Sequence, residues 1–207
     1  FFAFSGFCGI ILGNFPRRKN MKRIFFLLLT LVLSLPVLSE TVIVDGIHYQ
    51  IDQVVKEVSV KSKESKYSGA VIIPESIVYN SISYSVTSIS DNAFKGCEDL
   101  TSITIPNSVI SIGADAFSGC ESLTSFTIPS SVVNIGGTAF NNCKGLKAVH
   151  ISDLEAYFKI NFTNYSSNPL RYAHHLFIDG QEIKELVVPN SVRKIGNYAF
   201  TDCLAFT

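Results

Sequence analysis

The sequence predicts a β-rich solenoid, in which short coils of chain stack on one another, and three observations lead to this fold class. A 23-residue unit is written three times in succession between positions 86 and 154. A partial fourth copy, VRKIGNYAFTDC, begins at Val192. Side chains recur in step with this period, at Phe94, Phe117 and Phe140 and at Cys97, Cys120 and Cys143. A fixed period in the twenties is typical of solenoids, because each coil buries its apolar side only by stacking on a neighbour.

One half of each unit is predicted to be a β-strand. The four copies read LTSITIP, LTSFTIP, LKAVHIS and IKELVVP, and β-branched residues dominate them. Alternation places Leu100 and Ile103 toward the interior and leaves the hydroxyl side chains largely outside. Because equivalent strands recur once per coil, we expect them to pair in parallel, about 4.8 Å apart. The predicted inward column consists of Leu100, Leu123, Leu146 and Ile183.

The other half of the unit, VxxIGxxAFxxC, supplies the opposite wall as short turns or 3-10 helices. The residue before each cysteine tolerates a positive φ, which predicts a left-handed turn at Gly96, Gly119, Asn142 and Asp202. Glycine also follows the isoleucine of most copies. We expect a second tight turn at these positions, namely Gly113, Gly136 and Gly196, with Ser90 as the exception.

The stretch LTSITIPNSVISIGADAFSGC and its neighbours closely resemble the BspA-type leucine-rich repeat of bacterial surface proteins. The resemblance extends from about Ser68 to the end, and it lapses at Ser152 and in the segment that follows. It implies a leucine-rich-repeat solenoid with one parallel strand per 23-residue coil. It also implies adhesion to host matrix proteins or to other cells.

The N-terminal part of the chain is expected to lie outside the folded protein. Residues 1–20 precede the single methionine, Met21, and we interpret them as translated sequence upstream of the start. Residues 21–39 have the basic start, apolar run and small residues of a secretory signal peptide, with cleavage after Ser39. The apolar run is short for the alternative, a membrane anchor. We therefore expect a secreted or cell-surface protein without a membrane span after cleavage.

Removal of this part changes the charge. It leaves 12 basic against 17 acidic residues, a net charge of −5. An acidic protein without a basic stripe is a poor candidate for binding nucleic acid or an anionic membrane.

The remaining chain divides into a cap and a solenoid. Residues 40–67 predict an N-terminal β cap with a hairpin at Asp45-Gly46 and a third strand within 54–60. Residues 68–207 form the solenoid, with a small hairpin at 78–84. An irregular coil at 152–183 contains a short helix at 154–160, a loop and a hairpin at Asp179-Gly180. The strand register is expected to resume at Ile183. The chain stops without a terminal cap, which predicts a truncated piece of a longer protein.

Candidate chemistry is sparse. The cysteine spacing fits no compact zinc motif. Each repeat cysteine occupies an apolar position shortly after Ala-Phe, so buried free thiols are favoured over disulfides or metal ligands. The adjacent His174 and His175 point to different sides and are interpreted as loop residues. No hydrolase, metalloprotease, phosphate-loop or EF-hand motif occurs. We expect no metal, no cofactor and no enzyme; a hydrolase in residues 152–181 that uses His174 or His175 is the remote alternative.

The outward side of the strands is the predicted binding site, a parallel ribbon rich in hydroxyls and low in charge. The predicted contact residues are Ser102, Thr104, Ser125, Thr127, Lys147, His150, Glu185 and Val187. The favoured function is protein binding or adhesion, by a monomer, to a host extracellular-matrix or cell-surface protein. The alternative is a structural spacer within a larger surface protein.

Overall fold

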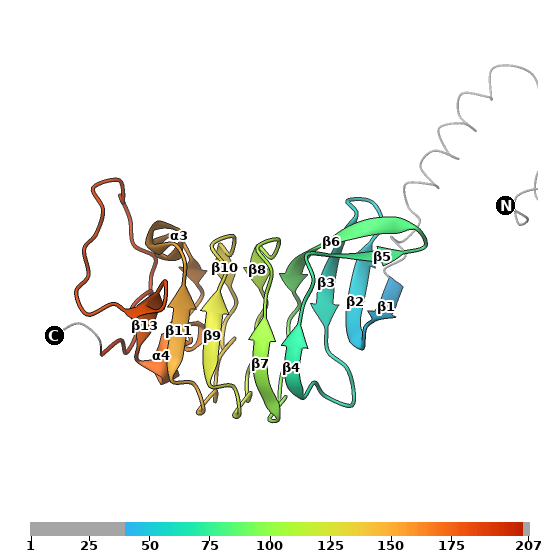
Figure 1. Cartoon of the computed structure of the whole chain (residues 1–207), viewed down its shortest axis with the longest axis horizontal. Coiled ribbons are helices and arrows are strands. Elements are labelled where there is room, and N and C mark those ends of the chain that lie inside the picture. The colour runs from blue at the N-terminus through green and yellow to red at the C-terminus, as the bar shows by residue number, and fades with distance from the viewer. Residues whose placement is uncertain (1–39, 205–207) are drawn as a thin grey trace, which may run out of the picture. The chain divides into compact units, whose positions relative to one another are not determined.

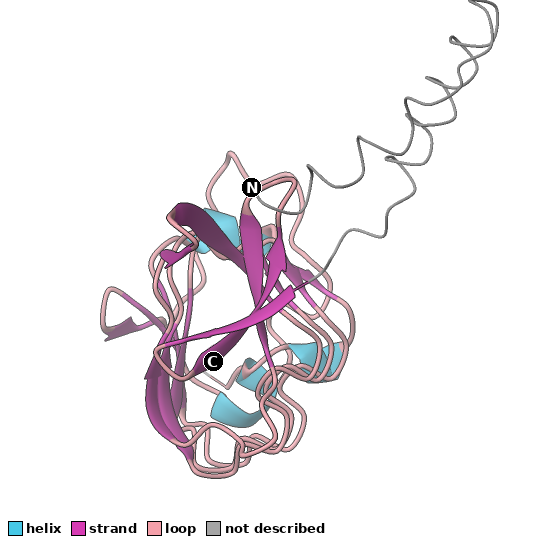
Figure 2. Ribbon diagram, turned by 90° about the vertical axis from the view of Figure 1, so that its right-hand side faces the viewer, coloured by secondary structure: helices cyan, strands magenta, loops and turns pink. Residues whose placement is uncertain are grey.

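The computed structural model describes residues 40–204, so the expected upstream segment and signal peptide lie outside the described residues. These residues form a β-solenoid of about five turns, and the predicted fold class is confirmed. Successive coils superimpose when the solenoid is seen end-on (Figure 2). Few helices occur, and strands and tight turns make up the walls of the coils.

The N-terminal cap has the predicted antiparallel strands. They are β1 (Glu40–Val44), β2 (Ile47–Asp52) and β3 (Glu57–Lys61). Positive φ angles at Asp45 and Gly46 make the tight hairpin turn between β1 and β2. Tyr49 and Val60 are fully buried beneath the sheet. The cap therefore covers the open end of the first coil with its apolar face.

The front wall is built from one strand per coil. These strands are β4 (Gly69–Ile72), β7 (Leu100–Thr104), β9 (Ser125–Ile128), β11 (Ala148–Ile151) and β13 (Leu176–Ile178). β4 pairs with β7, and β9, β11 and β13 pair in order, all in parallel as predicted. β14 (Gln181–Glu182) folds back antiparallel on β13. β7 and β9 are neighbours in Figure 1 but belong to separate ladders.

A second ladder of short strands runs along another wall, a feature that the sequence pattern did not predict. It continues the cap sheet through β6 (Ile82–Ile89), β8 (Ser111–Ile112), β10 (Asn134–Ile135) and β12 (Asn161–Phe162). The predicted hairpin of the first coil is present: β5 (Ser76–Tyr79) pairs antiparallel with β6 around Asn80-Ser81. The cap and the coils are thus joined by one continuous sheet.

The core confirms the predicted columns. Phe94, Phe117 and Phe140 are fully buried and stack in sequence, with ring centroids 5.1 and 5.3 Å apart. Leu100, Leu123 and Leu146 are buried on the front side. The left-handed turns before the cysteines are also present, with positive φ at Gly96, Gly119, Asn142 and Asp202.

The glycines after the isoleucine stand directly before or at the start of a turn, but the reason for glycine there is not a left-handed backbone. Gly113, Gly136 and Gly196 do not have positive φ. A Cβ on Gly113 would lie 2.4 Å from the backbone nitrogen of Asp91, and one on Gly136 would lie 2.4 Å from that of Ala114. Glycine is needed there because the backbones of successive coils nearly touch.

The irregular segment is itself a coil of the solenoid. It contains α3 (Leu154–Phe158), the strand β12, the 3-10 helix η1 (Tyr165–Ser167), α4 (Leu170–Ala173) and the strand β13. Asp153 caps α3 by accepting a hydrogen bond from the backbone N–H of Ala156. The short helix and the Asp179-Gly180 hairpin occur as predicted. The predicted loop instead carries β12 and η1.

The strand predicted at Ile183–Pro189 is wrong. The next position of the front wall is filled by β13, which begins seven residues before Ile183. β13 pairs with the outer edge of β11 and so leaves no place there for residues 183–189. Ile183 stays buried, but its N–H donates to the carbonyl of Leu176 in the antiparallel return of the chain. Residues 185–189 then run through a long loop.

Candidate binding face

The outward side chains of the five front strands form one surface, which we call the front face. The strand register aligns them in two transverse rows. The first row contains Ile72 and Thr104, followed by Thr127, His150 and Phe177. The second row contains Ala70, Ser102, Ser125 and Ala148.

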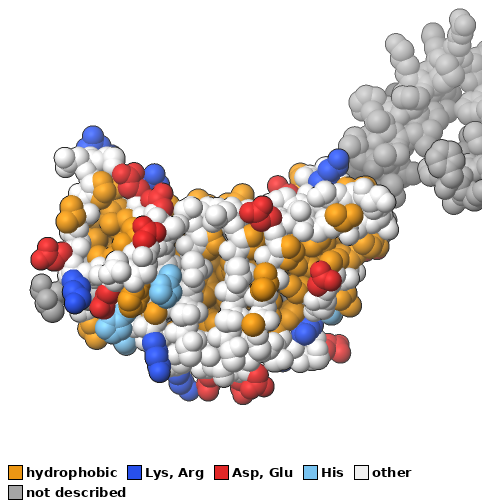
Figure 3. Space-filling model, viewed as in Figure 1, with side chains coloured by type: hydrophobic (Ala, Val, Ile, Leu, Met, Phe, Trp, Pro, Cys, Tyr) orange, Lys and Arg blue, Asp and Glu red, His pale blue; other side chains and the backbone are white. Residues whose placement is uncertain are grey.

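The hydroxyl side chains of the front face are exposed as predicted. Ser102, Thr104, Ser125 and Thr127 are open to solvent, whereas the alternating Phe126 is buried under them. Each strand is therefore fixed from below by core packing while its outer side is free to bind. Charged side chains lie mainly around the margin of this view of the molecule (Figure 3).

The end of the front face near β13 has a different chemistry. The His150 ring stacks on Phe177, with centroids 5.1 Å apart. Just before β13, His175 Nδ1 lies 2.5 Å from a carboxylate oxygen of Glu182 on β14. Lys147 is exposed just before β11, and among residues 40–204 no ion pair involves it. This end therefore combines aromatic, imidazole and charged groups.

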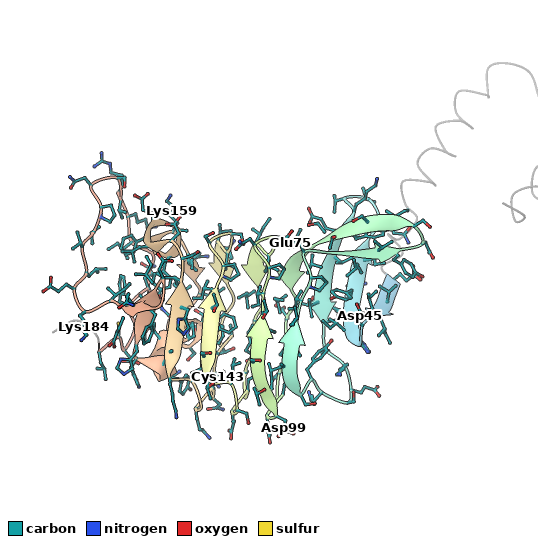
Figure 4. All side chains as sticks on the ribbon, in the orientation of Figure 1. Asp45, Glu75, Asp99, Cys143, Lys159 and Lys184 are labelled. Carbon is teal, nitrogen blue, oxygen red and sulfur yellow. The ribbon has the colours of Figure 1, made fainter. Side chains whose placement is uncertain are left out.

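Two predicted contact residues do not belong to the front face. Glu185 and Val187 lie in the loop after β14, and Val187 is 75% exposed there. Figure 4 shows the adjacent Lys184 beyond β13, away from β9 and β11. The physical reason is the early placement of β13, which gives the next position of the ribbon to Phe177.

Sequence reasoning missed Ile72, Phe177 and Glu182. The segment Ala70–Ile73 before Pro74 matches the strand position of the repeat, and its alternation contains a signal for Ile72. The Asp179-Gly180 turn marked Phe177 as part of a strand too. What the pattern could not show was which of two nearby strands joins the ladder.

The other candidate groups have structural surroundings. His174 ends α4 in a left-handed conformation, and its Nδ1 lies 2.8 Å from the carbonyl oxygen of Asp202. The thiols of Cys120 and Cys143 donate to the carbonyl oxygens of Phe94 and Phe117 in the preceding coil, at 3.2 and 3.1 Å. Burial raises the pKa of the Cys143 thiol to about 12 and that of Cys120 further. These thiols are packing residues rather than nucleophiles.

Two open hollows adjoin α3 and the last coil, with volumes of about 280 and 240 Å³. Both are lined by Phe158, Lys159 and Lys194. Within residues 40–204 no group of three or more histidine, cysteine or acidic side chains is placed to hold a metal ion. In the same part of the chain, no helix has the length and apolar character to cross a membrane.

Several solved structures are similar to this chain. A crystal structure of a leucine-rich repeat protein from Bacteroides capillosus ATCC 29799 is similar at 28% identity and a TM-score of 0.55, over 68% of this chain and 99% of that one. One from Bacteroides ovatus ATCC 8483 is similar at 31% identity and a TM-score of 0.47, over 58% and 33%. A leucine rich cell surface protein from Faecalibacterium prausnitzii A2-165 is similar at 16% identity and a TM-score of 0.35, over 81% and 53%. No curated protein matches the chain.

The family follows from the repeats themselves. Residues 74–207 match the model of the BspA type leucine rich repeat region in six copies. Solenoids of this family are typically binding modules without enzymatic activity. Since the match covers more than half of the sequence and the coils have the expected parallel strands, the chain belongs to the BspA-type leucine-rich repeat family.

Proposed function

We propose that this protein is a secreted or surface-displayed module that binds another protein through its front face. The observation that carries the proposal is the row of exposed, uncharged hydroxyl side chains on strands that are fixed by a buried core. A surface that is ordered before binding loses little conformational entropy on association. An uncharged centre with charges at the margin is the arrangement found in protein interfaces.

The location and partner class rest on the sequence and the family. The signal peptide expected at 21–39 directs the chain out of the cytoplasm, and the similar Faecalibacterium prausnitzii protein is described as a cell surface protein. We infer a host extracellular-matrix or cell-surface protein as the partner, bound by a monomer without a cofactor and without enzymatic chemistry.

The test is a front-face variant that combines Thr104→Asp, Thr127→Asp and His150→Asp. A partner that covers the three carboxylates would have to remove their water, and this cost opposes binding. Binding to immobilised extracellular matrix and to host cells should therefore fall at least about tenfold. Because all three side chains point outward, the thermal unfolding midpoint should stay within a few degrees, on the order of a surface substitution.

A matched variant controls for added charge. Asn107→Asp, Ser130→Asp and Asn134→Asp place three carboxylates on exposed positions outside the two front-face rows. This variant should bind like the wild type. Unchanged binding by the front-face variant would remove the front face as the contact surface and leave the spacer role as the better explanation of the coils.

A further inference from the structure

The first row of the front face has apolar groups at its two ends. Ile72 on β4 is 71% exposed, and Phe177 on β13 is half-buried beside His150. Between them lie the hydroxyls of Thr104 and Thr127. Ile72 and Phe177 are thus two potential anchors separated by a polar stretch.

The distance between these anchors follows from the strand spacing. The row crosses β4, β7, β9, β11 and β13, which lie side by side in this order (Figure 1). Three of the four intervals are between paired strands about 4.8 Å apart, and the interval between the unpaired β7 and β9 is at least as wide, so the separation is about 19 Å or slightly more. In an extended peptide, six residues advance about 20 Å, and an even number places the first and last side chains on the same side.

We propose that this row binds an extended peptide segment whose apolar side chains are six residues apart, with small polar residues between them and an acidic residue beside the second. The proposal rests on the protein-binding function and names the chemistry of the partner segment. The segment would run along the solenoid axis, with one apolar side chain on Ile72 and the other on the His150–Phe177 pair.

The hydroxyls favour an extended segment over a helix. The backbone N–H and C=O groups of an extended segment are open, so Thr104 and Thr127 can hydrogen-bond to them. A helix satisfies its own backbone groups and would instead need a continuous apolar stripe on the front face. The centre of the row offers no such stripe.

The positive charge of Lys147, near the second anchor, favours an acidic residue in the partner segment at that end. The carboxylate of Glu182 is already bound to His175, whereas Lys147 has no ion-pair partner among the described residues. Lys147 directly precedes β11, the strand that carries His150, and lies three residues before that histidine. A partner carboxylate next to the second anchor would complement this ammonium group, and salt would weaken that contribution.

The experiment selects phage-displayed random dodecapeptides on the wild-type protein and counter-screens them on the Thr104, Thr127 and His150 to Asp variant. Peptides that depend on the front face should be enriched in two apolar residues at positions i and i+6 with an acidic residue beside the second. In a synthetic copy of the best peptide, moving the second apolar residue to i+5 should weaken binding at least about tenfold, since it turns that side chain to the other side.

Variants of the protein test each contact in turn. Ile72→Ser and Phe177→Ser should each lower the affinity for the selected peptide at least about tenfold. Ile72 can be replaced without loss of core packing because it is exposed. Lys147→Ser should weaken it several-fold at low salt and leave its affinity unchanged near 1 M salt, where the Debye length is about 3 Å. Val133→Ser, an exposed apolar residue away from the front face, should bind like the wild type.

The outcomes separate this inference from the proposed function. Peptides that require the front face but lack the i and i+6 pattern would overturn the inference and leave the binding function intact. Peptides that bind the counter-screen variant equally well, or no enrichment at all, would also overturn the inference, whereas the proposed function is overturned only if the front-face variant keeps its binding to matrix and to cells.

Discussion

Gly136 and Gly119 show that one residue type serves two physical purposes in the same coil. At Gly136 a Cβ would lie 2.4 Å from the backbone nitrogen of Ala114, closer than real carbon contacts, although its φ is ordinary for any residue. At Gly119 the φ of +78° is left-handed, but a Cβ would have 3.5 Å of clearance. The first position forbids a side chain for lack of space, and the second only disfavours one for its conformation.

Gly136→Ala should therefore be more destabilising than Gly119→Asn. Overpacking against a neighbouring backbone should lower the free energy of unfolding by about 1–3 kcal/mol. Asparagine already occupies the left-handed position as Asn142, so Gly119→Asn should cost at most about 1 kcal/mol. Urea denaturation of both variants measures the difference. Equal losses would show that the coils can move apart at Gly136.

The repeat revealed both sets of glycines but not the reason for each. A period shows that a position needs glycine in every coil, and this is enough to predict a constraint. Distinguishing a left-handed φ from a close approach of two backbones requires the distance between Gly136 and the preceding coil, which depends on how the coils stack. At the position before the cysteine, the residue is glycine in some coils and Asn142 or Asp202 in others. These residue types share the tolerance of a positive φ, so this position did indicate a left-handed backbone.

At the scale of the elements, a buried side-chain amide is one of the contacts that hold the variant coil and the last coil together. The Asn168 side chain is fully buried, and its Nδ2 donates to the carbonyl oxygens of Tyr198 and Ala199, both at 2.8 Å. Its Oδ1 accepts from the N–H of Leu170 at 2.9 Å, at the start of α4. Tyr157 of α3 donates to the same Ala199 carbonyl at 2.5 Å. Three elements therefore meet at this side chain.

Asn168→Ala should loosen the last coil. The substitution leaves the buried N–H of Leu170 without its acceptor, which costs about 1–3 kcal/mol. The carbonyl oxygens of Tyr198 and Ala199 each lose one donor but keep Thr201 and Tyr157, respectively. Hydrogen exchange should quicken at Ala199 and Cys203 while Phe117, in the middle of the solenoid, keeps its protection. Asn161→Ala is the matched control, because the Asn161 side chain is exposed and its amide donates to the side chain of Asn134, on the surface. Unchanged exchange at Ala199 would contradict the role of Asn168.

Placement of elements was the part of the fold least accessible from the sequence. The helix at 154–158 and the hairpin at 179–180 follow from local signals, namely the Asp153 cap and the Asp-Gly turn. The choice between residues 176–178 and residues 183–189 as the next front strand is a competition between two segments for the edge of β11. Local patterns do not rank such competitors, and for this reason the sequence predicts Glu185 and Val187 in the ribbon in place of Phe177.

At the scale of the whole molecule, the thiols and the phenyl rings form a continuous interior column that links the coils. Tyr67 of the cap packs on Phe94 and donates its N–H to the sulfur of Cys97. Further along, each buried thiol donates to the carbonyl of the phenylalanine one coil before it. Stacking thus satisfies polar groups as well as burying apolar ones, which explains why a small thiol and not alanine suits this slot.

This column makes the stability of the solenoid sensitive to alkali. Burial raises the pKa of the Cys143 thiol from 9.0 to about 12 and also raises that of Cys97 and Cys120. A raised pKa in the fold means that the folded state holds the proton more tightly than the unfolded chain does. The stabilisation is complete below the unfolded pKa of 9.0 and is lost as the pH rises from there toward the folded value.

Cys143→Ala measures the share of one thiol in this effect. Well above the unfolded pKa, each buried thiol should lower the free energy of unfolding by about 1.4 kcal/mol per pH unit. Cys143→Ala should start from a lower stability, because it loses packing and the bond to Phe117, but its decline between about pH 9.5 and 10.5 should be shallower by that amount. Urea denaturation in the presence of a reductant gives both slopes. Parallel slopes would mean that the Cys143 thiol ionises as readily in the fold as in the open chain, which a thiol enclosed between two stacked coils cannot do.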